Sequence, residues 1–377
     1  MQRPKITYII ADINKAVFFE QTALALKNKG FELSFILINS ENGVLDKFLT
    51  TNDFVVKNIT VKKITKSLPA IIKCSAYLKK INPEIIHSHL GSANTIGLLA
   101  GFLAGIKKRI YTRHSGLPLN TSVKEKLLDI LHNKLATNIV AISQNIKEIL
   151  IQQKVKEEKI ILIHHGFDLD RMMQPNTNEV YRIKDTYNNK KQFPVIGVVA
   201  RWLELKGIQY TIPAFKKILL QYPNAKLCLF NATETAAYSK QIKELLNTLP
   251  DENYIVVPFE NNVYDLYQLF DIYIHVPINS SCEAFGQTYV ESLAAGIPSI
   301  FTLSGIAREF IKNEENALVV NFETTEEIYQ ALIRLLNNDD LANKLIINGR
   351  KDVLQHFNMN IYIDKLLVLY NMDINNL

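Results

Sequence analysis

Short apolar runs alternate with longer segments of helical periodicity along almost the whole chain. Runs with an apolar residue at nearly every position are typical of parallel strands that are buried on both faces. The predicted strands are 5–10, 33–38, 84–87, 109–112, 139–142 and 160–163 and, after a break, 195–200, 226–230, 254–257, 271–276 and 298–301. The predicted helices include 20–29, 92–104, 207–221, 239–249, 286–295 and 325–337.

This alternation predicts two successive α/β units of the Rossmann-like, doubly wound type. Residues 171–194 are polar, rich in Asn, Lys and Asp, and show no apolar period, so we interpret them as an inter-domain linker. The predicted domains are therefore 1–170 and 195–355. The last segment, 356–377, contains an amphipathic stretch that predicts a terminal helix over 359–370.

Length and composition agree with two water-soluble domains. A chain of 377 residues is too long for one ordinary core, and 47% apolar with 21% charged residues is usual for globular proteins. No apolar run approaches the roughly 18 residues that span a bilayer, and the first residues lack the features of a signal peptide. Three cysteines are too few for a disulfide framework, which favours a cytoplasmic protein.

Charge is distributed unevenly. Residues 1–174 hold 25 Lys and Arg against 14 Asp and Glu, a net charge of +11, whereas 175–377 carry a net charge of −5. This asymmetry argues against general nucleic-acid binding and suits a first domain that faces anionic lipid or a phosphorylated acceptor. On charge alone, solvated helix faces of a lysine-rich chain are the simpler explanation.

The strongest chemical pattern lies in the segment SCEAFGQTYVESLAAGIPS, residues 281–299. Glu283 and Glu291 stand eight residues apart, and Gly286 between them marks a turn at which a helix begins. The free amides of that first helical turn form an anion site. A phosphate held there would be flanked by two carboxylates that accept hydrogen bonds from sugar hydroxyls. The pattern therefore favours a nucleotide-diphosphate sugar as ligand.

The sequence EAFGQTYVE resembles the E-x7-E signature of retaining glycosyltransferases of the GT-B fold, most closely family 4. The resemblance implies that Glu283 contacts the donor sugar and that Glu291 binds the ribose hydroxyls. It also implies that the backbone amides of Phe285, Gly286 and Gln287 contact the diphosphate. The implied fold is two Rossmann-like domains facing across a cleft, with helix 356–377 crossing back to the first domain.

Two cations follow the predicted strand 195–200, in ARWLELKG. Arg201 and Lys206 could clamp a diphosphate, Arg in a bidentate manner. The spacing is similar to the R-x4-K-G motif of family 4, which implies that both bind the donor phosphates and stabilise the leaving nucleotide. Ordinary surface charges are the weaker alternative.

Histidines follow two strands of the first domain. The resemblance implies that His114, in YTRHSG, orients a sugar hydroxyl or stabilises charge. His87 and His89 are candidates for the acceptor side, although one of them could be a structural histidine. A zinc site of these three is a weak alternative because no Cys or acid completes the ligand set.

The loop after the first strand departs from the family. Many members carry a Gly-Gly pair there, but this chain has no glycine in residues 12–19, and Asn14 and Lys15 are candidates for acceptor contacts. Asp168-Leu169-Asp170 mimics a DxD metal motif. It follows a turn similar to the family's N-G-x-D, with His165 in place of Asn, so we do not interpret it as a metal site. We predict no metal and no cofactor.

The sequence thus predicts a retaining, metal-independent glycosyltransferase that moves a sugar from a nucleotide-diphosphate donor, with UDP favoured, to a glycan, glycolipid or lipid-linked hydroxyl. We expect a cytoplasmic protein, with peripheral membrane contact as an option. The alternatives are a non-catalytic nucleotide-sugar-binding protein and a carbohydrate enzyme of glycogen or trehalose type on the same fold. A nicotinamide-dependent dehydrogenase is disfavoured because G-x-G-x-x-G is absent after the early strands.

Overall fold

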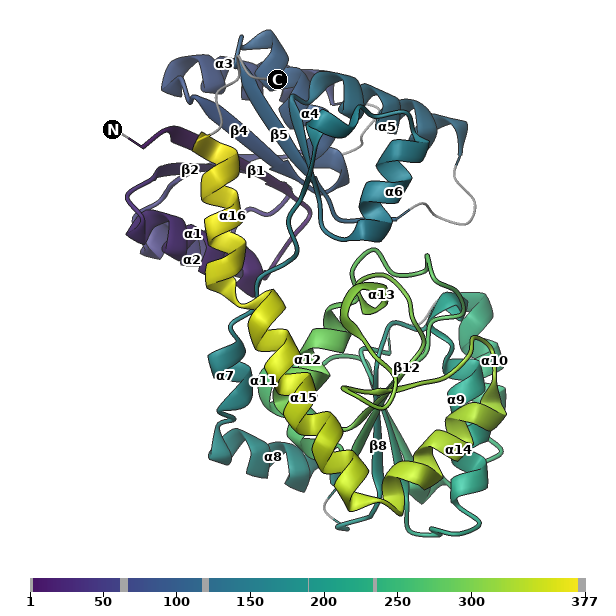
Figure 1. Ribbon diagram of the computed structural model, residues 1–377. Helices are drawn as coiled ribbons and strands as arrows, with labels where there is room; N and C mark the ends of the chain where they lie inside the picture. The colour runs from purple at the N-terminus through teal and green to yellow at the C-terminus, as the bar shows by residue number, and fades with distance from the viewer. Residues whose placement is uncertain (1–2, 62–66, 117–121, 189, 233–235, 372–377) are drawn as a thin grey trace. The chain divides into compact units, whose positions relative to one another are not determined.

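The computed structural model describes residues 3–61, 67–116, 122–188, 190–232 and 236–371. The chain forms two compact units, each built around one parallel sheet (Figure 1). Unit 1 comprises Met1–Phe167 together with Met359–Leu377, and unit 2 comprises Asp168–Asn358. The two Rossmann-like units predicted from the alternation of elements are thereby confirmed.

The described part of unit 1 has a seven-stranded sheet of order β3-β2-β1-β4-β5-β6-β7. Its strands are β1 (Lys5–Ala11), β2 (Glu32–Ile38), β3 (Val55–Ile59), β4 (Ile85–His89), β5 (Lys108–Arg113), β6 (Asn138–Ala141) and β7 (Ile160–Leu162). Its helices are α1 (Val17–Asn28), α2 (Val44–Thr51), α3 (Leu68–Ile81), α4 (Gly91–Leu103), α5 (Val123–Leu135), α6 (Gln144–Gln152), the 3₁₀ turn Glu157–Lys159, and α16 (Met359–Asn371).

Both faces of this sheet are covered by helices. Successive side chains of a strand point to opposite faces, so one strand contributes to two core clusters. In β1, Ile6, Tyr8 and Ile10 join a core cluster that contains residues of α1, α2 and α16. Ile9 and Ala11 join a second cluster, with residues of α3 and α4. The terminal helix α16 is therefore part of the core of unit 1, to which it contributes Leu366, Leu369 and other residues.

Unit 2 has a six-stranded sheet of order β10-β9-β8-β11-β12-β13 over its described residues. Its strands are β8 (Val195–Val199), β9 (Lys226–Phe230), β10 (Tyr254–Val257), β11 (Ile272–His275), β12 (Ser299–Phe301) and β13 (Leu318–Val319). Its helices are α7 (Leu169–Met173), α8 (Thr177–Asn188), α9 (Ile208–Ile218), α10 (Ala236–Leu246), α11 (Val263–Leu266), α12 (Gln287–Ala295), α13 (Ala307–Phe310), α14 (Thr325–Leu336) and α15 (Asp339–Phe357), with 3₁₀ turns η3 (Glu204–Lys206), η4 (Asp251–Asn253) and η5 (Tyr267–Leu269).

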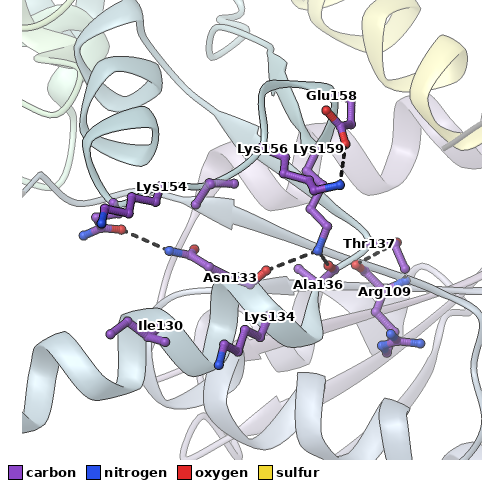
Figure 2. A pocket seen from close by; sticks show the side chains of 12 residues that line it. Arg109, Ile130, Asn133, Lys134, Ala136, Thr137, Lys154, Lys156, Glu158 and Lys159 are labelled. Carbon is purple, nitrogen blue, oxygen red and sulfur yellow. Dashed lines mark hydrogen bonds and ion pairs between the residues drawn. The ribbon is translucent and has the colours of Figure 1, made fainter.

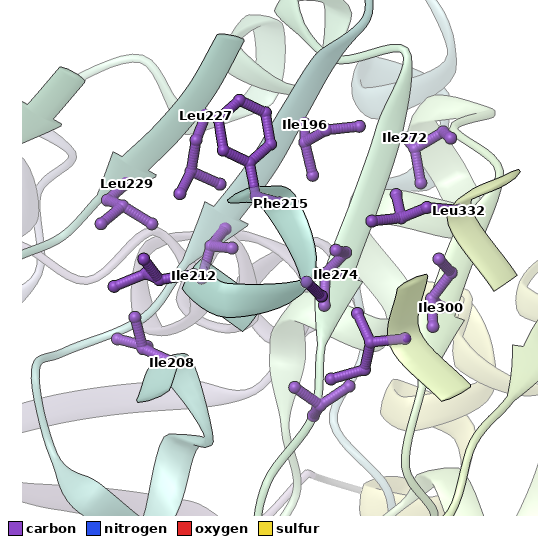
Figure 3. Packing of buried hydrophobic residues seen from close by; sticks show 14 of the residues in the cluster. Ile196, Ile208, Ile212, Phe215, Leu227, Leu229, Ile272, Ile274, Ile300 and Leu332 are labelled. Carbon is purple, nitrogen blue, oxygen red and sulfur yellow. The ribbon is translucent and has the colours of Figure 1, made fainter. Parts of the chain in front are cut away.

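The main core of unit 2 lies between its sheet and helices α9, α10 and α14 (Figure 3). Ile196, Leu227 and Ile274 project from three neighbouring strands toward Phe215 of α9 and Leu332 of α14. Each of these side chains is fully or almost fully excluded from water, which stabilises the unit by roughly 1.5–3 kcal/mol per side chain. This packed sheet is the rigid support for the loops that follow its strands.

The interpretation of residues 171–194 as an inter-domain linker needs correction. The segment belongs to unit 2, and most of it is the helix α8. Its apolar residues Val180, Ile183 and Tyr187 are spaced for one helical face, but the polar and charged residues that make up most of the helix hide that period in the sequence. Tyr187 packs edge-on against Phe230, with ring centroids 5.1 Å apart, so α8 is held on the sheet.

The edge strand β3 was not predicted. It pairs in parallel with β2, with Ser34 opposite Val55. Its sequence, VVKNI, is short and partly exposed, as edge strands often are, so it carries little apolar signal. In the described part of the chain, no helix is both long and apolar enough to cross a bilayer.

Candidate functional site

The candidate residues of unit 2 are brought together at one edge of its sheet. In a parallel sheet the carboxyl ends of all strands lie at the same edge, which is where ligands bind. Arg201 follows β8, and Lys206 ends the 3₁₀ turn η3 in the same connection. His275 is the last residue of β11, and Glu283 lies in the loop between that strand and α12.

Glu283 is the centre of a buried hydrogen-bonded cluster. One carboxylate oxygen, Oε1, accepts hydrogen bonds from Lys206 Nζ at 2.5 Å and from His275 Nε2 at 2.9 Å. The backbone N–H of Glu283 donates to Ser304 Oγ at 3.1 Å, which fixes the loop against the segment after β12. The side chain is therefore held by Lys206 and His275, and the backbone by Ser304.

These contacts fix the charge of Glu283. Burial raises the pKa of its carboxyl, but the bonds to His275 and the charge of Lys206 outweigh burial and hold the pKa at about 2. Burial lowers the pKa of His275, so its imidazole is neutral at pH 7 and donates its Nε2–H to the carboxylate. Glu283 is accordingly an anion at every pH at which the protein is expected to work.

Lys206 and Arg201 occupy different environments. The sequence predicts that both clamp a diphosphate, but the ammonium of Lys206 is paired with Glu283 and is mostly buried. Arg201 is exposed, and within the described residues its guanidinium makes no hydrogen bond or ion pair. Arg201 is thus the cation available to an anionic ligand, whereas Lys206 primarily neutralises Glu283.

The helix α12 begins directly after a turn at Gly286, as the sequence predicts. This residue is the N-cap of the nine-residue helix, with φ of +89°, a conformation that favours glycine. The amides of Gln287 and Thr288 open the helix, and no acidic side chain lies in its first turn. Phe285 is buried and packs against Phe357, so its side chain does not face a ligand, and its carbonyl accepts from the Ile306 amide at 2.9 Å.

Glu291 lies one turn further into α12 and is half-buried. Its Oε2 accepts a hydrogen bond of 2.7 Å from Tyr267 Oη, and burial raises the pKa of its carboxyl. Within the described residues, its other oxygen has no hydrogen-bond partner. Tyr267 therefore orients Glu291 and leaves one carboxylate oxygen for a ligand hydroxyl.

The histidines of unit 1 fall into two kinds. His87 is fully buried, and its ring nitrogens contact Tyr370 Oη at 2.7 Å and Thr112 Oγ1 at 2.8 Å. Both hydrogen-bonding groups are thus used to join β4, β5 and α16. Of the two alternatives for His87, the structure supports a structural histidine, because both ring nitrogens already have partners.

His89 and His114 contact each other through their ring nitrogens. His89 Nδ1 lies 3.0 Å from His114 Nε2, and His165 stacks on His114 with ring centroids 5.3 Å apart. The Nε2 atom of His89 is buried and has no partner in the part of the chain that the structure describes. Burial lowers the pKa of His114 to about 4, so the pair is neutral at pH 7.

Two of the remaining sequence candidates, Asn14 and Asp168, have structural contacts. Asn14 Oδ1 accepts from the Val44 amide at 3.2 Å, so this side chain ties the loop after β1 to the start of α2. Lys15 is exposed, and its role stays a prediction. Asp168 of the DxD-like sequence caps α7 by accepting from the Arg171 amide at 3.1 Å. The described residues contain no group of three or more side chains placed to hold a metal ion.

His275, Tyr267 and Ser304 are contacts that the sequence reading missed. The one available signal was His275, a histidine at the end of the strand IYIH. Tyr267 and Ser304 come from a 3₁₀ turn and a loop, where no periodic pattern marks a functional position.

We predict that His275 positions Glu283. Replacing His275 by Leu removes one donor from the carboxylate and should lower kcat/KM for sugar transfer by about 10- to 100-fold. His275→Gln places an amide N–H near the former Nε2 and should retain activity to within about fivefold. Steady-state kinetics of both variants tests this. Equal activity of the Leu variant and the wild type, or equal loss in both variants, would contradict it.

A second prediction concerns acid stability. Burial lowers the pKa of His87 to about 3 and of His114 and His132 to about 4, and lowers those of His89 and His165 well below the usual value. Between these values and about 6.5 the unfolded chain binds more protons than the folded one, so stability falls as pH falls. The expected slope is up to about 1.4 kcal/mol per pH unit for each histidine.

All five histidines belong to unit 1, whereas unit 2 contains only His275 and His356. Hydrogen exchange at pH 7, 6 and 5 should therefore show that unit 1 loses protection before unit 2. Constant protection of unit 1 over this range would show that the histidines are not the acid-labile groups.

Comparison with known proteins assigns most of the chain to two family models. The family described as Glycosyl transferases group 1 matches residues 181–352, and Glycosyltransferase Family 4 matches residues 16–171. The chain is 27% identical to the Staphylococcus aureus capsular polysaccharide biosynthesis glycosyltransferase CapM over 312 residues, which cover 81% of this chain and 80% of CapM.

Two further similarities extend over nearly the full length. The Escherichia coli UDP-Gal:alpha-D-GlcNAc-diphosphoundecaprenol alpha-1,3-galactosyltransferase is 24% identical over 92% of this chain and 90% of its own length. The crystal structure of Anabaena HepE in complex with UDP and glucose has a TM-score of 0.83 at 18% identity, covering 98% of this chain and all of HepE, and shows the fold. The chain therefore belongs to the GT-B glycosyltransferases of the group 1, family 4 type.

Proposed function

We propose that this glycosyltransferase is a retaining, metal-independent enzyme that moves a sugar from a nucleotide-diphosphate donor, with UDP favoured, to an acceptor hydroxyl in surface polysaccharide or glycolipid assembly. The names of CapM and of the E. coli galactosyltransferase support this acceptor class. The UDP bound to HepE supports the donor class.

Each candidate residue of unit 2 has a distinct proposed role. The amides at the start of α12 and the exposed Arg201 bind the diphosphate, because both offer unpaired donors to an anion. Glu283 accepts a hydrogen bond from a hydroxyl of the donor sugar. Glu291, oriented by Tyr267, accepts from the ribose hydroxyls.

The observation that carries this proposal is the ionised, immobilised carboxylate of Glu283 directly before a free helix amino end. A carboxylate and an anion site separated by three residues fit a ligand that presents hydroxyls beside a phosphate. The bond between the anomeric carbon and the phosphate oxygen would break, and a bond from that carbon to the acceptor oxygen would form on the same face. The acceptor proton would go to the departing phosphate.

On unit 1, we propose that the His89–His114 pair contacts a sugar hydroxyl. The pair is neutral, so one ring can donate and the other accept without a charge being buried. Lys15 is proposed as a further contact of the acceptor.

Metal independence gives a direct prediction. Arg201 and the α12 amides would stabilise the charge of the leaving group, so EDTA should leave the transfer rate unchanged to within about twofold. The rate is measured as nucleotide release with and without added magnesium. Loss of transfer in EDTA and its recovery with magnesium would contradict this part of the proposal.

A turnover assay distinguishes an enzyme from a non-catalytic nucleotide-sugar-binding protein. The purified chain is incubated with UDP-, GDP- and ADP-sugars, and release of the free nucleotide is followed over hours. Slow hydrolysis of one donor class, faster in the presence of glycolipid acceptors, supports an enzyme. Tight binding of a donor without any release supports the binding protein instead.

A further inference from the structure

The outer face of α5 in unit 1 carries a stripe of exposed apolar side chains. Val123, Leu127 and Ile130 are 75%, 61% and 47% exposed. Their spacing of four and three residues places them on one side of the helix, and Lys134 continues the same line. Leu128, Leu131 and Leu135 of the same helix are less exposed, so the row of three large apolar residues on its outer side is separate from them and requires an explanation.

The helix itself is well anchored, so the exposure is not due to fraying. Ser122 and Glu125 form a capping box at its start. On its inner side, His132 is buried and its Nε2 lies 2.8 Å from Thr95 Oγ1 of α4. The stripe is therefore presented outward by a fixed helix.

Cations flank the stripe. Next to Ile130 and Lys134 lies a hollow of about 710 Å³ whose rim carries Lys154 and Lys156 (Figure 2). Lys126, Lys134 and Lys154 are exposed, and within the described residues none of their ammonium groups has an ion-pair partner. Two deeper cations, Arg109 and Lys159, instead donate to backbone carbonyls at the end of α5, at 2.8 Å to Leu135 and 3.0 Å to Ala136.

The acids of this region are already engaged. Glu125 is used in the capping box, Asp129 pairs with Arg113 at 2.8 Å, and Glu158 pairs with Lys156 at 3.2 Å. The lysines beside the stripe therefore produce a local positive field. It adds to the net charge of +11 over residues 1–174.

We propose that the α5 face, defined as Val123, Leu127 and Ile130 with Lys126, Lys134 and Lys154, binds the surface of an anionic lipid bilayer. An apolar row flanked by lysines lets the row enter the headgroup region while the ammonium groups contact lipid phosphates. A second copy of the chain is a poorer occupant, because symmetric contact would bring the unpaired lysines of both copies together. The proposal goes beyond the proposed catalytic function and does not depend on it.

Vesicle binding of the full chain tests the proposal. Vesicles of phosphatidylcholine alone, and of phosphatidylcholine with about 30% phosphatidylglycerol, are sedimented with wild type at low salt. We expect binding to the anionic vesicles only, and at least a tenfold lower partition coefficient for Leu127→Gln/Ile130→Gln. The partition coefficient of a charge variant, Lys134→Gln/Lys154→Gln, should fall by a similar factor. Salt at about 0.5 M should weaken vesicle binding of the wild type.

Matched controls use apolar residues exposed elsewhere. Leu220→Gln/Ile347→Gln changes two side chains of unit 2 that are 84% and 67% exposed and should bind as wild type does. Thermal unfolding verifies that each variant is folded. The proposal is overturned if wild type ignores anionic vesicles, if the α5 variants bind normally, or if Leu68→Gln/Ile72→Gln on α3 causes an equal loss. Concentration-dependent dimers that the α5 variants abolish would identify a second copy as the occupant instead.

Discussion

Glu283→Gln is expected to lower kcat/KM for sugar transfer by at least about 10³-fold, roughly 4 kcal/mol of transition-state stabilisation. The amide has the shape of the carboxylate but no charge, and it cannot accept from both Lys206 and His275 while also accepting from a sugar hydroxyl. Steady-state kinetics with the best donor measures the effect. A variant that retains more than a tenth of wild-type activity would rule out the role assigned to Glu283.

The same substitution leaves Lys206 without its partner in a largely buried position. Stability should fall by about 3–5 kcal/mol, because an unpaired buried charge is costly. A double variant, Lys206→Met/Glu283→Gln, removes that charge and should recover much of the stability but none of the activity. This pair of variants separates loss of catalysis from loss of folding.

Gly207→Ala is expected to be the most damaging single methyl addition near the site. Gly207 joins η3 to α9 with φ of +74°, and an added Cβ would lie 1.9 Å from the carbonyl oxygen of Val276. Two backbone segments would have to move apart, including the one that carries Lys206. We expect a loss of at least about 3 kcal/mol in the free energy of unfolding, measured by urea denaturation, and weaker donor binding.

Gly105→Ala is the matched control. Gly105 has a similar φ of +78°, but nothing lies within 4 Å of its added Cβ. This variant should lose only about 1–2 kcal/mol, the cost of the left-handed conformation alone. Equal losses for the two variants would show that the contact with Val276 is not what makes Gly207 necessary.

The sequence predicted the fold well because buried parallel strands are almost continuously apolar, a pattern that survives without an alignment. It failed where that signal is weak. β3 at the sheet edge needs few apolar residues, and α8 hides Ile183 and its neighbours in a polar segment that was read as a linker. In both cases tertiary packing, and not the local pattern, decides the structure.

The places of some candidate residues in the fold could also be predicted from the sequence. Arg201 and Gly286 stand next to a strand end and a helix end, and Glu291 follows Gly286 at a fixed helical spacing, so position in the sequence fixes position in space. The partner of Lys206 could not be predicted, because the contact with Glu283 joins residues 77 positions apart. His87 and His89 differ in their contacts although they are two residues apart: His87 bonds to Tyr370 of α16 and to Thr112, whereas His89 bonds to His114.

The central claim is that unit 2 binds a nucleotide diphosphate through Arg201 and the start of α12. Isothermal titration of the full chain with UDP, GDP and ADP in EDTA tests it most directly, followed by the same titration of Arg201→Gln and of Lys240→Gln, an exposed lysine of unit 2. We predict one bound nucleotide per chain, at least about tenfold weaker binding for Arg201→Gln, and unchanged binding for Lys240→Gln. Absence of binding by all three nucleotides, or equal affinity in the wild type and Arg201→Gln, would contradict the account.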